Sequence, residues 1–206
     1  MKTQLDHLVI SAQSLPVGVA RVEALLGVAL SPGGEHPNMG THNGLLSLGP
    51  GRYLEVISIN PDAPAPDWPR WFDLDNFTGA PRLTNWVSRV NDMDTALAAA
   101  PAGTGRALPQ TRGDLRWKMA VPEDGRLPFG GAFAGLIEWQ GRAHPAQMLP
   151  DVGCRLNKLI ITHPSADELR QSLQKMGDLP DVEITPGPEI ALKAIIETPN
   201  GAVVLE

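Results

Sequence analysis

The chain of 206 residues lacks the features that mark several common protein classes. Its single cysteine, Cys154, rules out an internal disulfide and a cysteine-rich zinc site. No apolar run is long enough to cross a bilayer, and no charged-then-apolar signal segment begins the chain. These absences predict a cytoplasmic protein that has no membrane partner.

Strong charge of one sign is also missing. The formal net charge is −6 and no block of like charges occurs, which argues against a nucleic acid or an anionic membrane as the main partner. The phosphate-loop pattern GxxxxGK[ST], a complete GxGxxG and the GxSxG pattern of serine hydrolases are all absent. We therefore expect a small molecule as the partner.

The residues that are present predict a β-rich fold. Apolar residues make up 42% of the chain, enough for a buried core, and 21 glycines and 20 prolines indicate many turns and short strands. Residues 5–11 and 53–59 have the composition of strands, and residues 17–26 have helical spacing that ends at Gly27. Residues 5–60 are thus interpreted as a β-α-β-β-β unit.

The same pattern recurs at residues 82–140 and again at residues 151–206, so an α+β fold of repeated β-α-β-β-β modules is predicted. We place the first two modules in a paired domain over residues 1–150 and the third module in residues 151–206. The connector at residues 61–81 is rich in proline and tryptophan and is expected to pack against the body. The odd third module has a sheet without an internal partner, which makes a homodimer possible.

Four segments carry a resemblance to a known superfamily. They are Leu5-Asp6-His7-Leu8-Val9, Gly40-Thr41-His42-Asn43-Gly44-Leu45-Leu46-Ser47-Leu48-Gly49, Tyr53-Leu54-Glu55-Val56-Ile57, and Leu136-Ile137-Glu138-Trp139 followed by His144-Pro145. They resemble the glyoxalase-like domain group of the vicinal oxygen chelate superfamily. The resemblance implies curled mixed sheets that form a cup, with helices outside and a metal held by the first and last strands of each module.

Carried over by residue, the resemblance implies His7, Glu55, Asn85 and Glu138 as metal ligands. One imidazole and two carboxylates suit Mn, Fe, Ni or Zn, whereas the Asn85 amide is a weaker ligand than the usual histidine. Lys158 takes the corresponding place in the third module and would repel a cation. Asp6 would point to the opposite strand face and so could not support His7 from beside it.

Further residues are candidates for catalysis or binding. Glu138 could move a proton, and His42 is interpreted either as a general base or ligand or as a rim residue. The expected substrate pocket contains Tyr53, Trp71, Trp139 and Arg116, and Trp86 is interpreted as core. Trp117 and the other arginines of the second unit, Arg82, Arg89 and Arg112, are further candidates, with exposed strand charges as the alternative for the arginines. His36, His144 and His163 are expected in loops or at bends.

Two functions follow from these expectations. The first is a glyoxalase-like, metal-dependent lyase, isomerase or dioxygenase that acts on a small oxygenated substrate. The second is a metal-free module of the same fold that binds or sequesters a small molecule in the cup, favoured by Asn85 and Lys158 at two ligand positions.

Overall fold

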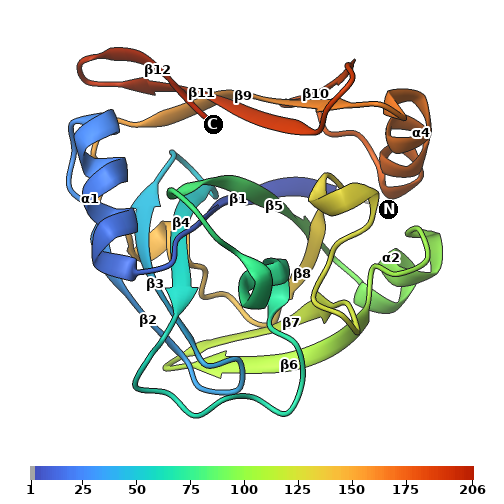
Figure 1. The fold of residues 1–206 in the computed structure, drawn as a ribbon, viewed down its shortest axis with the longest axis horizontal. Helices are drawn as coiled ribbons and strands as arrows, with labels where there is room; N and C mark the ends of the chain where they lie inside the picture. The colour runs from blue at the N-terminus through green and yellow to red at the C-terminus, as the bar shows by residue number, and fades with distance from the viewer. Residues whose placement is uncertain (1–2) are drawn as a thin grey trace.

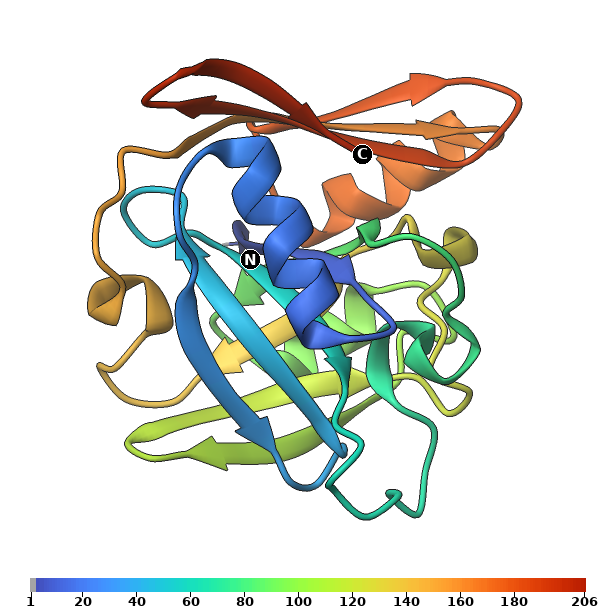
Figure 2. The ribbon, with the colours of Figure 1, turned by 60° about the vertical axis from the view of Figure 1, so that its left-hand side comes forward.

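The computed structural model describes residues 3–206 and has the α+β architecture predicted from the sequence. A curled eight-stranded sheet forms the body, and a separate four-stranded sheet lies across one side of it (Figures 1 and 2). Within residues 3–206, no helix is both long enough and apolar enough to cross a membrane.

The elements follow the predicted order. The first unit contains β1 (Thr3–Ser11), α1 (Leu15–Leu26), β2 (Ser31–His36), β3 (Thr41–Ser47) and β4 (Tyr53–Ile59). The second contains β5 (Arg82–Val90), α2 (Met93–Ala99), β6 (Arg106–Arg112), β7 (Leu115–Val121), η2 (Phe129–Gly131) and β8 (Gly135–Trp139). The short helix α3 (Pro145–Met148) leads to the third unit, which contains β9 (Arg155–His163), α4 (Ala166–Met176), β10 (Val182–Pro186), β11 (Ala191–Thr198) and β12 (Gly201–Leu205).

The first two units form the large sheet together. Its strand order is β2-β3-β4-β1-β5-β8-β7-β6, with β1 and β5 antiparallel at the centre and one unit on each side. The outermost strands β2 and β6 contact each other, so the sheet curls into a cup (Figure 1). Residues that point inward from either unit therefore face a common interior.

Helix α1 packs on the outer face of the cup because its buried side is small and apolar. A Cβ added to Gly18 would lie 2.7 Å from Ala12 and from Val56, so glycine allows the helix to approach the sheet closely. The helix ends at Gly27, whose φ of 70° is left-handed and whose N–H donates to the Glu23 carbonyl. The predicted stop at Gly27 is confirmed.

The connector between the first two units enters the cup. Its short 3₁₀ segment, η1 (Trp71–Asn76), buries Trp71, Phe72 and Leu74 against inward-facing residues of both units, among them Val9 and Ile137. Burial of these aromatic and aliphatic side chains holds the connector to the body, as expected from its composition.

The third unit has the predicted element order but a different strand pairing. Its sheet order is β10-β9-β11-β12, with β9 parallel to β10, whereas in the first unit β1 is parallel to the last strand, β4. The end of β12 therefore occupies an edge and is not equivalent to the Glu55 region of β4. The third unit packs its apolar residues into the outer core shared with α1 and with the outer face of the large sheet.

Candidate functional site

A narrow cavity lies inside the cup, and both units contribute to its wall. The first unit supplies His7, His36, Asn43, Tyr53 and Glu55, the connector supplies Trp71 and Phe72, and the second unit supplies Arg112, Trp117, Met119, Ile137 and Trp139. Polar groups thus come mainly from one side of the cup and aromatic or apolar groups from the other. About 30 Å³ is free among these side chains.

His7 is held by its neighbour Asp6, and the expectation that Asp6 points away was wrong. The pairing of β1 with β5 shifts register between Leu5 and His7, leaving Asp6 in a bulge. A bulge re-aims side chains that would otherwise alternate between faces. Asp6 Oδ1 lies 2.8 Å from His7 Nδ1, so this carboxylate fixes the ring orientation and holds a proton on Nδ1.

Asp6 also joins both halves of the cup. Its Oδ2 accepts a hydrogen bond from Trp139 Nε1 at 3.1 Å and lies 3.0 Å from His144 Nε2. Burial alone would raise the pKa of the Asp6 carboxyl, but the hydrogen bonds with His144 and His7 lower it well below its ordinary value. Asp6 is therefore a buried carboxylate that is charged at neutral pH.

Glu55 faces His7 across the cavity wall. Its Oε2 lies 3.6 Å from His7 Nε2, and its Oε1 accepts a hydrogen bond of 2.5 Å from Asn43 Nδ2. Asn43 is fixed in turn, because its Oδ1 accepts from the Gly34 N–H at 2.8 Å and from Arg112 at 3.2 Å. One oxygen of the Glu55 carboxylate is thus anchored while the other faces the imidazole.

His36 belongs to this site, although the sequence placed it in a loop. Its Nε2 lies 3.2 Å from Arg112, whose guanidinium can only donate, so Nε2 is the acceptor and Nδ1 carries the proton bonded to Thr41 at 3.0 Å. Burial and the nearby Arg112 charge lower the pKa of His36 to about 3, so the ring is neutral. Local sequence did not mark His36 as a site residue. The structure places it beside β3, because Glu35 pairs with His42 and His36 with Thr41 across a tight turn.

The aromatic wall surrounds the imidazoles. Tyr53 stacks on His7 with ring centroids 4.4 Å apart, and burial, followed by the charges of Asp6 and Glu55, raises the pKa of its phenol well above the ordinary value. Trp71 contacts His36 edge-on, and Trp117 packs against Trp139. The site therefore combines a neutral Tyr53 and an apolar rim with a few ordered polar groups, the composition typical of small-molecule sites.

Four residues expected at the site lie elsewhere. Strand alternation points Ile137 and Trp139 into the cup and Glu138 out of it, where its carboxylate accepts from the Met93 N–H at 2.8 Å. His42, half-buried, is bonded to Ser58 at 2.8 Å on the face of β3 opposite to Asn43. The other two are Asn85, which lines a different pocket, and Arg116, which is exposed and whose place in the cup is taken by Arg112.

The donor set does not fit the implied metal. His7 and Glu55 share the cavity, but the second unit offers no imidazole or carboxylate beside them, since Glu138 is turned outward and the Asn85 amide donates to the Gly131 carbonyl. Across residues 3–206, no three His, Cys, Asp or Glu side chains are grouped so that they could hold a metal ion.

Comparisons with solved structures find proteins of similar structure. A hypothetical protein from Staphylococcus aureus is 12% identical, with a TM-score of 0.64 over 92% of this chain and 88% of that one. A methylmalonyl-CoA epimerase from Mycobacterium tuberculosis is 18% identical, with a TM-score of 0.44 over 68% and 88%. A Streptomyces coelicolor methylmalonyl-CoA epimerase variant is 17% identical, with a TM-score of 0.42 over 68% and 97%.

No curated protein matches the chain. The family model described as glyoxalase-like domain matches residues 5–177, which include both halves of the cup and the start of the third unit. This protein therefore belongs to the glyoxalase-like domain family.

Proposed function

We propose that this protein is an enzyme that moves a proton at a carbon next to a carbonyl group, on a small oxygenated substrate bound in the cup. The observation that carries the proposal is the Glu55 carboxylate 3.6 Å from His7 Nε2, with the other imidazole nitrogen held by buried Asp6. Asn43 holds the far side of Glu55 and Asp6 holds the far side of His7, so the two groups face each other in fixed positions. General acid–base catalysis uses side chains positioned in this way.

Each polar group has a role in this reaction. Glu55 takes the proton from carbon, the electron pair of the C–H bond moves into the carbonyl group, and an enolate forms. The proton can pass from Glu55 to His7, because Asp6 stabilises the imidazolium. Arg112 faces the same cavity and offers N–H donors to the enolate oxygen or to a substrate carboxylate.

Hydrogen exchange tests this reaction without knowledge of the natural product. Pyruvate, 2-oxobutanoate and 2-oxooctanoate are incubated with the enzyme in D2O. Loss of the signal of the C3 protons, which lie next to the ketone carbonyl, is followed by NMR. We expect wild-type protein to accelerate exchange and Glu55→Gln to lose about 100-fold or more, the usual contribution of a catalytic base.

His42→Gln is the matched control for His7→Gln, because both replace an imidazole but His42 lies outside the cup. We expect His7→Gln to slow exchange and His42→Gln to leave it unchanged. Equal exchange in wild-type and Glu55→Gln protein, or none with any of the three acids, contradicts the proposal.

Metal-dependent catalysis is the alternative that the superfamily resemblance suggests. It predicts that EDTA abolishes exchange and that Mn²⁺ or another divalent ion restores it. The outward Glu138 and the hydrogen-bonded Asn85 favour the metal-free reaction instead. We therefore expect exchange to persist in EDTA and no stoichiometric metal in protein purified without chelator.

A binding module without catalysis is the second alternative, favoured by the aromatic wall of Trp71, Trp117 and Trp139. In that case calorimetry would detect binding of the 2-oxo acids while exchange stayed at the rate of the buffer. Trp139→Ala would then abolish binding, and His7→Gln would have no effect on it.

A further inference from the structure

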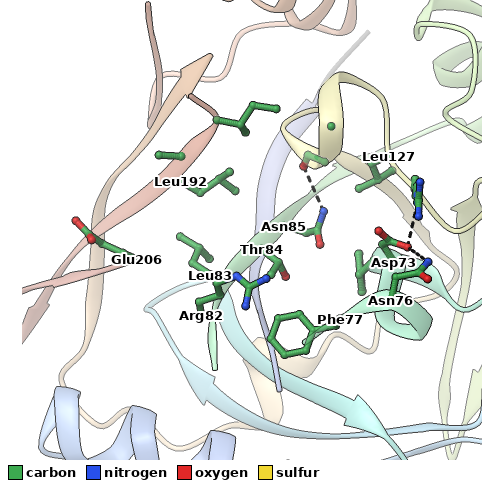
Figure 3. A pocket seen from close by; sticks show the side chains of 16 residues that line it. Asp73, Asn76, Phe77, Arg82, Leu83, Thr84, Asn85, Leu127, Leu192 and Glu206 are labelled. Carbon is green, nitrogen blue, oxygen red and sulfur yellow. Dashed lines mark hydrogen bonds and ion pairs between the residues drawn. The ribbon is translucent and has the colours of Figure 1, made fainter. Parts of the chain in front are cut away.

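A second and larger pocket adjoins the cup. It has a volume of about 600 Å³ and lies where η1, the start of β5 and the start of β11 meet (Figure 3). Its size falls within the range of about 300–1,000 Å³ typical of small-molecule sites, whereas about 30 Å³ is free in the cup. The cup therefore has little free space beyond its polar groups, and the larger pocket offers room for the rest of a substrate.

The walls of this pocket combine polar and apolar side chains, and the apolar ones come from several segments. Leu83, Leu127 and Leu192 come from three separate segments (Figure 3), and Phe77 and Ile190 add to the lining. Ile190 is 43% exposed, so part of this apolar surface faces solvent. Its contact with Gly130, where an added Cβ would lie 2.6 Å from Ile190 Cδ1, places Ile190 over the η2 turn.

The charged side chains that line the pocket are Asp73, Arg82, Arg126 and Glu206, so their formal charges cancel. Asp73 pairs with Arg126 at 3.2 Å, and Arg82 lies over the Phe77 ring, 4.5 Å from its centroid, while donating to the Thr78 carbonyl. Asn85 is 4% exposed and uses its N–H to reach Gly131, and its Oδ1 accepts no hydrogen bond from the described chain, residues 3–206. The pocket thus suits an apolar group with little charge.

Phe72 separates the two cavities. Its side chain lines both the cup and the larger pocket, and it is the one residue that the two linings share. Phe72 and Asp73 have φ values of 59° and 53°, a left-handed backbone that costs energy in residues other than glycine. Strain of this kind is concentrated in segments that clamp ligands or switch between conformations.

We propose that the cup and the larger pocket form one extended substrate site, in which Phe72 is the movable partition. The oxygenated head of the substrate lies beside Glu55 and Arg112, and an apolar tail of medium length lies against Leu127, Leu192 and Ile190. The position of the head rests on the proposed function, whereas the tail site rests on the pocket alone.

Calorimetry with pyruvate and 2-oxooctanoate tests the tail site. The two acids share one head group, and the longer acid adds methylene groups that the pocket would remove from water, each of which favours binding. We expect 2-oxooctanoate to bind at least about tenfold more tightly than pyruvate. Ile190→Asp should remove most of that difference and leave pyruvate binding unchanged.

Val17→Asp is the matched control for Ile190→Asp. Val17 is an exposed apolar residue on α1, 57% exposed, and lies at neither cavity, so this variant adds the same charge without touching the tail site. It should retain the full preference for the longer acid. Equal affinities of the two acids for wild-type protein, or a preference that survives Ile190→Asp, would overturn the proposal.

Phe72→Gly tests the partition. Glycine accepts a φ of 59°, so this variant removes the wall while relieving the strain. We expect faster association of 2-oxooctanoate in stopped-flow measurements of tryptophan fluorescence, and an unchanged rate argues against Phe72 as the partition. If the chain-length preference is present but no α-proton exchange occurs in any variant, the tail site stands and the proposed proton transfer fails.

Discussion

Individual buried residues determine which polar groups face the cavity of the cup. Asp6 and His36 were not expected at the site, yet each is almost fully buried and hydrogen-bonded there. His7 and Glu55 do lie together as the resemblance implied, but their catalytic role stays a proposal. The residue types alone suggested His7 and Glu55 as site residues of the first unit. The backbone bulge at Asp6 decided which of their atoms have hydrogen-bond partners.

The pH dependence of stability should report the neutral state of His36. Its pKa falls from an ordinary value of 6.5 to about 3, chiefly through burial and then through Arg112, His7 and His42. Between these pH values the unfolded chain binds a proton that the folded chain excludes, so the free energy of unfolding falls as the pH drops. The slope approaches about 1.4 kcal/mol per pH unit.

Urea unfolding at pH 7 and pH 5 measures this effect. In His36→Gln the side-chain oxygen can still accept from Arg112 but does not titrate, so the loss of stability between the two pH values should be smaller than in wild type. Asp6, whose pKa is also lowered, has an ordinary value of 3.8 and contributes below this window. An identical loss in both proteins would show that His36 does not control the dependence.

Individual helices and strands were predictable where alternating apolar residues or a helix-ending glycine define them. The helix that ends at Gly27 and the strands around His7 and Glu55 lie close to their expected places because their patterns are local. Glu138 shows the limit of such reasoning, since a shift of one residue along β8 exchanges the inner and outer faces. An alignment between diverged repeats cannot resolve that shift, whereas the pairing of β8 with β7 does.

Strand β2 offers a test of how close packing orders the site. A Cβ on Gly33 would lie 2.4 Å from the Asn43 carbonyl oxygen and 2.0 Å from its side-chain oxygen, whereas one on Gly34 would meet the flexible Arg112 side chain at 2.7 Å. We expect Gly33→Ala to cost about 1–3 kcal/mol by overpacking, and Gly34→Ala to cost less.

Chemical denaturation of both variants checks this order. Because Asn43 anchors Glu55, Gly33→Ala should also slow the proposed exchange more than Gly34→Ala does. A larger cost for Gly34→Ala would show that Arg112, and not the backbone of β3, is the rigid partner of β2.

One apolar core outside the cup connects the third unit to the large sheet. Leu159, Ile161 and Ile196 of the third unit belong to the same apolar cluster as Leu8 and Trp86 of the large sheet. The third sheet therefore contributes to the stability of the cup, although its strands line no part of the cavity beside His7. Within residues 3–206, β10 and β12 each pair on one side only, so a homodimer through these edges stays a prediction.

Leu159→Ala tests this shared core. The side chain is fully buried, and truncation should cost about 2–5 kcal/mol. All five tryptophans lie between Trp68 and Trp139, outside the third unit, and four of them lie away from the core that the two sheets share, so their fluorescence reports mainly on the cup. We expect the fluorescence transition in Leu159→Ala to shift by as much as the circular dichroism transition does.

Val204→Ala is the control, because Val204 belongs to the same unit but is 54% exposed and should change stability by less than about 0.5 kcal/mol. If the fluorescence midpoint stayed at the wild-type value in Leu159→Ala, the third unit would unfold separately. The division at residue 150 that the sequence predicted would then also be a boundary of cooperative unfolding.

Local patterns by themselves determined the α+β class, the order of the elements, and a histidine and a glutamate on the strands of one unit, because alternation, helical spacing and turn residues act over a few neighbours. Only the tertiary structure decided which side chains share the cup. The bulge at Asp6, the outward register of Glu138, the approach of Arg112 to His36 and the entry of Phe72 depend on contacts between segments far apart in the chain. Such contacts leave no local periodicity from which they could be predicted.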